Sequence, residues 1–272
     1  MELSLYLEQL YHNKIEVQKT NLGLTNDIYC AYINGVKCAI RVPKEDISDL
    51  IGTKEKQVLD LIKNTELDVE EIYYDPITRI RITKWVDALE FDKYTSEDKY
   101  VRATNLIKKL HTYKFKVDHY FDAVQTYESF LKNINNNLFN YQDYKHVIDA
   151  YQNLKQDMIL CHNDLVAGNI LLANDKEYLI DYEYAGMNYA IFDLMSFISE
   201  NNIDDNNIRE LIYLTYFGNN LNDEIRHDLK VVENMQNLLW AAWANMLYDS
   251  RKEEIYLNIF KDKIKHLIEG TK

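Results

Sequence analysis

Residues 158–199, MILCHNDLVAGNILLANDKEYLIDYEYAGMNYAIFDLMSFIS, contain the polar residues around which the rest of the chain can be arranged. Within this stretch His162, Asp164 and Asn169 form the pattern His-x-Asp-x4-Asn. Phosphoryl transfer needs a carboxylate that orients and deprotonates the acceptor hydroxyl, and it needs oxygen ligands for Mg²⁺. The spacing therefore predicts that Asp164 is the catalytic base and that Asn169 is a metal ligand.

A short hairpin is predicted directly after this motif. The apolar runs 170–173 and 178–180 are separated by the turn-forming residues 174–176. Such a hairpin brings Asp181, and with it Glu183, back beside the first acidic group, where both can act as metal ligands. The alternative interpretation is a pair of buried strands whose flanking loops carry acids by chance.

Two segments of this stretch resemble a known family. CHNDLVAGNIL at 161–171 and IDYEYAGMNYAIFDL at 180–194 are similar to the choline/ethanolamine kinases of the bacterial LicA-like kind. That family lies within the aminoglycoside-phosphotransferase and protein-kinase-like superfamily. His-x-Asp replaces the His-Arg-Asp of protein kinases, and Asp-Tyr-Glu replaces their Asp-Phe-Gly, which indicates a small-molecule kinase. The resemblance implies an α+β, protein-kinase-like fold of two lobes, and it implies that His111 packs behind the catalytic loop.

Composition indicates a globular chain with no nucleic-acid partner. The 272 residues are 47% hydrophobic and 28% charged, and their formal net charge is −13. This charge repels nucleic acid and favours a small cationic substrate. No apolar run is long enough for a membrane span, and the N-terminus carries no leader pattern, so we expect a cytoplasmic protein. The three cysteines, Cys30, Cys38 and Cys161, show no disulfide or zinc spacing.

The first 87 residues are predicted to form a small antiparallel sheet with helices. Asn34-Gly35 between the apolar runs 28–33 and 36–42 is a strong hairpin signal. The alternating segments 71–74 and 79–86 predict two further strands. Residues 88–272 are expected to form a larger lobe that contains the catalytic hairpins. The helices expected outside the sheet cover residues 4–11, 47–63, 97–111, 120–136, 144–155, 191–200, 208–217, 223–249 and 253–269.

The resemblance implies a nucleotide site in the first lobe. A loop that approaches the phosphates through its backbone comprises Gly23, Leu24, Thr25 and Asn26. Arg41 on the outgoing strand would hold the phosphates while paired with Glu55, although Lys54 and Glu45 lie nearby as competitors. Trp85 and Val86 match the segment that joins the lobes and binds adenine.

The acceptor pocket is expected in the last third of the chain. Trp240 and Trp243 lie three residues apart on one predicted helix, so their rings face the same side. Two indoles can enclose a quaternary ammonium, which is attracted to each ring face. The resemblance adds Tyr184 and Glu200 as further walls beside Asp164. A buried core stripe is the alternative for the tryptophans, and an exposed helix-end acid is the alternative for Glu200.

Together these features predict an ATP- and Mg²⁺-dependent kinase that phosphorylates the hydroxyl of choline to give phosphocholine. An ethanolamine kinase, or an aminoglycoside or other amino-alcohol phosphotransferase, is the alternative enzyme. A catalytically inactive binding module is disfavoured because Asp164, Asn169 and Asp181 are all present.

Overall fold

The computed structural model describes residues 2–20, 26–44 and 54–272. The chain divides into two compact units. The first unit comprises Met1–Lys99 and Ala167–Tyr184, and the second comprises Tyr100–Val166 and Ala185–Lys272. The boundary expected near residue 87 falls inside the first unit, which also takes up the hairpin segment expected with the helical part.

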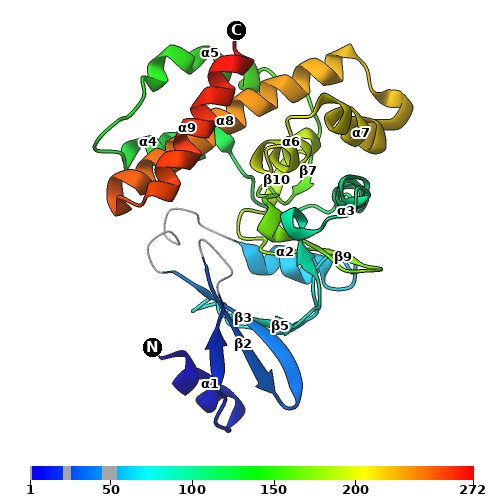
Figure 1. Cartoon of the computed structure of the whole chain (residues 1–272), viewed down its shortest axis with the longest axis vertical. Coiled ribbons are helices and arrows are strands. Elements are labelled where there is room, and N and C mark those ends of the chain that lie inside the picture. Colours follow the sequence, from blue (N-terminus) through cyan, green and yellow to red (C-terminus); the bar gives the residue numbers. More distant parts are fainter. Residues whose placement is uncertain (1, 21–25, 45–53) are drawn as a thin grey trace. The chain divides into compact units, whose positions relative to one another are not determined.

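A five-stranded antiparallel sheet dominates the first unit, with the strand order β1-β2-β3-β5-β4. Its strands are β1 Val17–Lys19, β2 Asn26–Ile33, β3 Val36–Pro43, β4 Glu71–Tyr74 and β5 Arg81–Lys84 (Figure 1). The predicted hairpin is confirmed: Asn34 and Gly35 adopt φ values of 50° and 80° between β2 and β3. Two positive φ values in succession are what a type I′ hairpin turn requires. The strand β1 was not predicted, because it is only three residues long.

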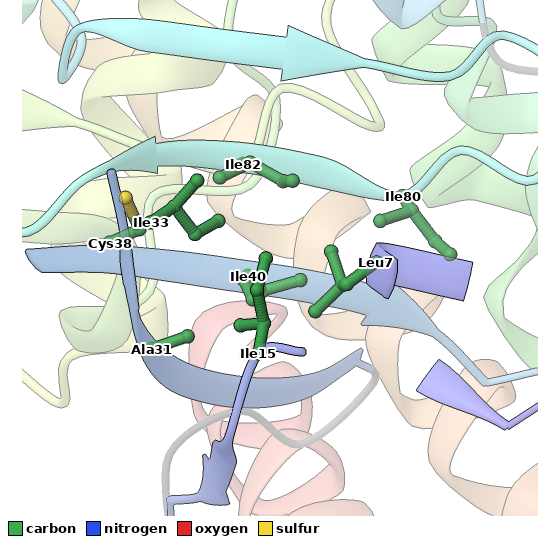
Figure 2. Packing of buried hydrophobic residues seen from close by; sticks show 8 residues of the cluster. All are labelled: Leu7, Ile15, Ala31, Ile33, Cys38, Ile40, Ile80 and Ile82. Atoms are coloured by element: carbon green, nitrogen blue, oxygen red, sulfur yellow. The ribbon is translucent and has the colours of Figure 1, made fainter. Parts of the chain in front are cut away.

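One face of this sheet carries the hydrophobic core of the first unit. Cys38 and Ile40 are two residues apart on β3, so both point to the same face. Figure 2 shows them in one cluster with Leu7 of α1 (Leu3–Tyr11) and Ile15. Arg41, the next residue on β3, points to the opposite face, toward the helix α2 (Glu55–Ile62). Residues 47–53 of the longer predicted helix lie outside the described residues.

A second sheet in the first unit has three strands in the order β6-β8-β9. The hairpin predicted after the polar motif is confirmed as β8 Ile170–Leu172 and β9 Glu177–Leu179, and Ala173 N donates to Lys176 O across its turn. The 3₁₀ turn η3 (Ala167–Asn169) leads into this hairpin, and β6 (Leu89–Glu90) pairs with β8.

The second unit is mainly helical, as expected. The central helix α8 is buried on all sides from Val231 to Leu247 with the exception of Asn234, and it packs against α4, α5, α6 and α9. Figure 1 shows α8 and α9 lying side by side. The helices are α3 Lys99–Thr112, α4 Ala123–Lys132, α5 Lys145–Gln152, α6 Ala190–Glu200, α7 Asn206–Phe217, α8 Asp223–Arg251 and α9 Glu254–Gly270.

Two local features of this unit differ from the sequence prediction. The helix α4 begins later than predicted because Asp122 caps it: its Oδ1 accepts hydrogen bonds from Val124 N (3.0 Å) and Gln125 N (2.9 Å). It also ends earlier than predicted, at Lys132. The strands β7 (Met158–Cys161) and β10 (Gly186–Tyr189) were not predicted, and they pair antiparallel, one before and one after the segment that contains His162, Asp164 and Asn169. Among the residues that the structure describes, no helix has the length and apolar character to cross a membrane.

Candidate active site

A buried chain of charged side chains lies between the large sheet and the small hairpin of the first unit. Arg41 Nη1 donates to Glu55 Oε1 at 2.7 Å, and Arg41 Nη2 donates to Glu55 Oε2 at 2.5 Å. Both side chains are buried, and Glu55 is the first residue of α2, where a negative charge suits the helix N-terminus. This two-point contact holds the guanidinium plane in one orientation.

Asp181 joins this ion pair from the end of the hairpin. Its Oδ1 accepts a hydrogen bond from Arg41 Nη1, and its Oδ2 accepts one from Asn26 Nδ2 at 2.9 Å. Asn26 is the one member of the expected phosphate loop that the structure describes, since residues 21–25 lie outside the described residues. Four residues predicted from the sequence to belong to the site are therefore joined in one hydrogen-bonded cluster: Asn26, Arg41, Glu55 and Asp181.

The electrostatics of this cluster favour the charged form of each partner in the ion pair. Burial alone would lower the pKa of Arg41, but Glu55 and then Asp181 outweigh it and raise that pKa well above its ordinary value. Burial likewise acts to raise the pKa of Glu55, but the attraction of Arg41 wins and leaves that pKa lowered. Glu183, half-buried beyond Asp181, adds to the negative field that acts on Arg41.

The hairpin β8–β9 places Asn169 at the same end as Asp181. Ile170 pairs with Leu179, and Ile180 N donates to Asn169 O at 2.9 Å, so the two residues leave the hairpin from neighbouring backbone positions. Asp181 adopts φ 66°, a left-handed conformation that Asp tolerates better than most residues. Asn169, Asp181 and Glu183 offer the amide and carboxylate oxygens that Mg²⁺ prefers, so this donor set fits a magnesium site.

A cavity of about 440 Å³ opens elsewhere in the first unit. Trp85 and Val86, expected near adenine, line it together with residues 87–89 and 172–174. Lys37 Nζ lies 4.2 Å from the ring centroid of Trp85, and Trp85 N donates to Lys37 O at 2.9 Å. The cavity lies in the usual size range of small-molecule sites, and the segment after β5 forms one of its borders.

In the second unit, a buried carboxylate holds the loop that carries Asp164. Asp193 of α6 is fully buried and accepts hydrogen bonds from the backbone N–H groups of His162 (2.8 Å) and Asn163 (2.7 Å). Ser196, one turn later on α6, accepts from Leu165 N at 2.9 Å. The half-buried Asp164 therefore stands in a loop whose backbone is tied to one helix on both sides of it.

Asp193 was not singled out as a functional residue from the sequence. The signal was present, because an aspartate in the apolar run Ile191–Ile198 must have partners if the helix is buried. His111, expected to support the loop, lies with Nε2 2.9 Å from Asp193 Oδ2. Cys161 also lies close to Asp193, but burial raises the pKa of its thiol well above the ordinary value. A protonated thiol is neither a nucleophile nor a good metal ligand.

The left-handed conformation of Asn163 is stabilised by a network of buried amides. Asn163 has φ 68°, and its Oδ1 accepts from Asn188 Nδ2 at 2.8 Å. Asn188 Oδ1 in turn accepts from the hydroxyl of Tyr151 at 3.2 Å and from the backbone of Tyr189 at 2.8 Å. The network links the loop that carries Asp164 to β10 and α5, and the sequence did not indicate that Asn188 would stabilise this loop.

The predicted acceptor residues are divided between the units. Tyr184 is buried and is the last residue of the segment Ala167–Tyr184 of the first unit. Trp240 and Trp243 are buried on α8 of the second unit, with ring centroids 6.2 Å apart and planes at 89°. Trp243 also contacts the ring of Tyr256 on α9 edge-to-face, at 5.7 Å. Burial at this level fits a deep cation pocket and a core stripe equally well.

Glu200, expected to supply a negative charge, already has a cationic partner. Lys263 Nζ lies 3.0 Å from Glu200 Oε1. The sequence contained a signal for this ion pair, because Lys263 interrupts the apolar stripe formed by Tyr256, Phe260 and Leu267 on α9. It contained no indication that the partner would be Glu200, which lies 63 residues away.

The sequence and the fold were compared with those of known proteins. The sequence model described as "Choline/ethanolamine kinase" matches residues 17–216. The protein LicA of Haemophilus influenzae is 26% identical over 243 residues, which cover 82% of this chain and 71% of LicA. Ethanolamine kinase 2 of Rattus norvegicus is 45% identical over 49 residues, 17% of this chain and 13% of its own length. The structure of choline kinase LicA from Streptococcus pneumoniae superposes with a TM-score of 0.78 and 20% identity over 98% of both chains.

Proposed function

The chain belongs to the choline/ethanolamine kinase family and is therefore a phosphotransferase with an alcohol acceptor, and we propose that it transfers the γ-phosphoryl group of ATP to the hydroxyl of choline. The observation that supports choline as the acceptor is the perpendicular pair of rings formed by Trp240 and Trp243. Their ring faces can border a trimethylammonium group on two sides, and such a group has no N–H that requires an acceptor.

The first unit supplies the nucleotide side of the proposed reaction. Arg41, held by Glu55 and kept cationic by its raised pKa, would bind the phosphates. The segment Gly23, Leu24, Thr25 and Asn26 would approach them through its backbone, and Trp85 with Val86 would border adenine in the cavity after β5.

Asn169, Asp181 and Glu183 are proposed to hold Mg²⁺. Bound Mg²⁺ neutralises charge on the phosphate oxygens. In the structure both carboxylate oxygens of Asp181 accept hydrogen bonds, from Arg41 and Asn26. These two contacts orient the carboxylate before the nucleotide arrives, and they make Arg41 and Asn26 part of the support of the metal site.

Asp164 is proposed to accept the proton of the choline hydroxyl. Its loop is tied to Asp193 and Ser196 by three backbone hydrogen bonds, so the carboxylate is positioned by groups that do not themselves react. A base held in this way loses little entropy when the substrate binds, which is one source of catalytic rate. Tyr184, Glu200, Trp240 and Trp243 complete the proposed acceptor site.

Ethanolamine is the second candidate acceptor, because ethanolamine kinase 2 of Rattus norvegicus matches a part of the chain at 45% identity. Its primary ammonium needs hydrogen-bond acceptors, and Glu200 is a carboxylate in the proposed site. An aminoglycoside has several ammonium groups and needs a broad acidic surface, for which two buried tryptophans are poorly suited.

The test is ADP release from Mg-ATP with choline, ethanolamine, thiamine and kanamycin as separate acceptors. We expect the highest kcat/KM with choline, a lower value with ethanolamine and no turnover with kanamycin. A preference for ethanolamine would replace the proposed acceptor with the second candidate. ADP release that does not depend on any amino alcohol would contradict the proposal.

A further inference from the structure

Lys263 of α9 is a buried lysine with a defined set of partners. Its side chain is 5% exposed, and Nζ donates to Ser199 O at 2.8 Å and to Glu200 Oε1 at 3.0 Å. Burying an ammonium is unfavourable unless it is paired and hydrogen-bonded, so this lysine needs Glu200 as its counter-charge. The two acceptors are the last residues of α6, and Lys263 thereby connects α6 to α9.

The ion pair of Glu200 and Lys263 belongs to segments that contact α8 near Gln236 and Trp243. The helices α8 and α9 lie side by side (Figure 1). Asn234 Nδ2 donates to Gly270 O, and the ring of Trp243 contacts that of Tyr256, so the two helices run antiparallel. Along α9, Lys263 comes between Tyr256 and Gly270. On the other side, Ser199 Oγ donates to Gln236 Oε1 at 3.0 Å, one helical turn before Trp240. The segments that carry the two partners of the pair therefore contact α8 within about one helical turn of Trp240 on one side and at Trp243 on the other.

Only one oxygen of Glu200 takes part in these contacts. Lys263 Nζ donates to Oε1, and Ser199 Oγ lies 3.4 Å from the same oxygen. Among the described residues, Oε2 of Glu200 receives no hydrogen bond. The Oε2 atom of Glu200 can therefore accept a hydrogen bond from a ligand. The negative charge of Glu200 is nevertheless balanced by the positive charge of Lys263.

A neutralised carboxylate affects the two candidate acceptors differently. A quaternary ammonium makes no hydrogen bonds and depends on ring faces, so it loses little when Glu200 is neutralised. A primary ammonium has three N–H groups, and it gains most from a carboxylate whose charge is not shared with another cation.

We propose that Lys263 is a specificity-determining residue which, by pairing with Glu200, favours a quaternary over a primary ammonium acceptor. This inference rests on the proposed function and deepens it. Lys263 acts through Glu200 and does not contact the reacting atoms, so it is a positioning residue.

The experiment compares kcat/KM for choline and for ethanolamine in the wild type and in Lys263→Met. Methionine has a similar length and suits a buried position, and it frees the charge of Glu200. We expect the choline-to-ethanolamine ratio to fall about tenfold, the equivalent of one charge-assisted hydrogen bond gained by ethanolamine. The change should appear mainly as a lower KM for ethanolamine, while kcat for choline changes little.

Two controls separate this effect from charge and packing. Lys265→Met removes the same charge from an exposed position of the same helix, and the ratio should stay at the wild-type value. In the double variant Glu200→Gln, Lys263→Met no carboxylate is freed, so the fall of the ratio should disappear. If Lys263→Met does not fold, Lys263→Gln, which keeps N–H donors for both oxygen acceptors, carries the same test.

A folded Lys263→Met protein with an unchanged ratio would overturn the inference while leaving the choline activity of the wild type, and hence the proposed function, intact. A fall of equal size in Lys265→Met would overturn it too, because the cause would then be net charge. A wild-type protein that phosphorylates neither amino alcohol would instead refute the proposed function itself.

Discussion

At the scale of single residues, Asp164 is the group on which the proposed chemistry depends most directly. Asp164→Asn keeps the size of the side chain but removes its basicity, so we expect kcat to fall by about 10²- to 10⁴-fold. The binding of ATP and the melting temperature should remain near wild type, because the loop is held by Asp193 and Ser196. Steady-state kinetics and a nucleotide titration check this, and a near-normal kcat would remove Asp164 from its role.

Glu55 is the residue for which the structure predicts a pH effect on stability. Its pKa is lower in the folded protein than its ordinary value of 4.5, so the unfolded chain binds more protons in this range. The stabilisation by Glu55 is therefore complete above pH 4.5 and is lost as the pH falls through the folded pKa.

The variant Glu55→Gln lacks this dependence. We expect it to be less stable by about 3 kcal/mol near neutral pH, because a buried arginine loses a charged partner. Its loss of stability between about pH 5 and 3 should be smaller than that of the wild type. Urea unfolding over this pH range tests both statements, and parallel pH curves for the two proteins would contradict the second.

At the scale of elements, the helix α6 holds the backbone of the loop that carries Asp164. Asp193→Ala leaves the backbone N–H groups of His162 and Asn163 without their buried acceptor, at about 1–3 kcal/mol for each group. We expect a lower melting temperature together with a fall in kcat that exceeds any change in KM for ATP.

The matched control for Asp193 is Glu210→Gln on α7, which removes one carboxylate from an exposed ion pair with Arg226. It should change the free energy of unfolding by less than about 1 kcal/mol and leave kcat unchanged. Thermal melts and kinetics on the same preparations make the comparison. If Asp193→Ala lost stability but kept its kcat, α6 would support the fold without positioning the loop.

At the scale of the whole molecule, the residues of one proposed reaction are distributed over two compact units. Arg41, Glu55 and Asp181 belong to the first unit, and Asp164 and the tryptophans belong to the second. The His-x-Asp-x4-Asn motif itself is divided, because the first unit begins again at Ala167, between Asp164 and Asn169. The proposed role of the tryptophans in substrate selection must therefore be tested on the complete chain.

Trp240→Ala and Trp243→Ala distinguish a cation site from a core stripe. If the rings contact the trimethylammonium, each variant should raise KM for choline about tenfold, which corresponds to about 1.4 kcal/mol, and affect ethanolamine less. If the rings only pack, each variant should lose about 3–5 kcal/mol of stability with an unchanged choline-to-ethanolamine ratio. Melting temperatures and both kcat/KM values on the same preparations decide between the two.

The sequence by itself determined those parts of this protein that depend on neighbours along the chain. Asn34-Gly35 required a hairpin, the apolar runs around residues 174–176 required another, and the spacing of Asp164, Asn169 and Asp181 indicated phosphoryl transfer. Each of these signals is local, because turn geometry and side-chain periodicity act over a few residues.

The tertiary structure alone decided which distant groups meet. Asp181 lies 140 residues from Arg41, and Glu200 lies 63 residues from Lys263, so no periodic pattern could pair them. For the same reason, no local pattern could show that Asp193 on α6 binds the backbone of the loop that carries Asp164. A buried charge must find a counter-charge or a hydrogen-bond partner, but the packing of helices and sheets determines which one is within reach.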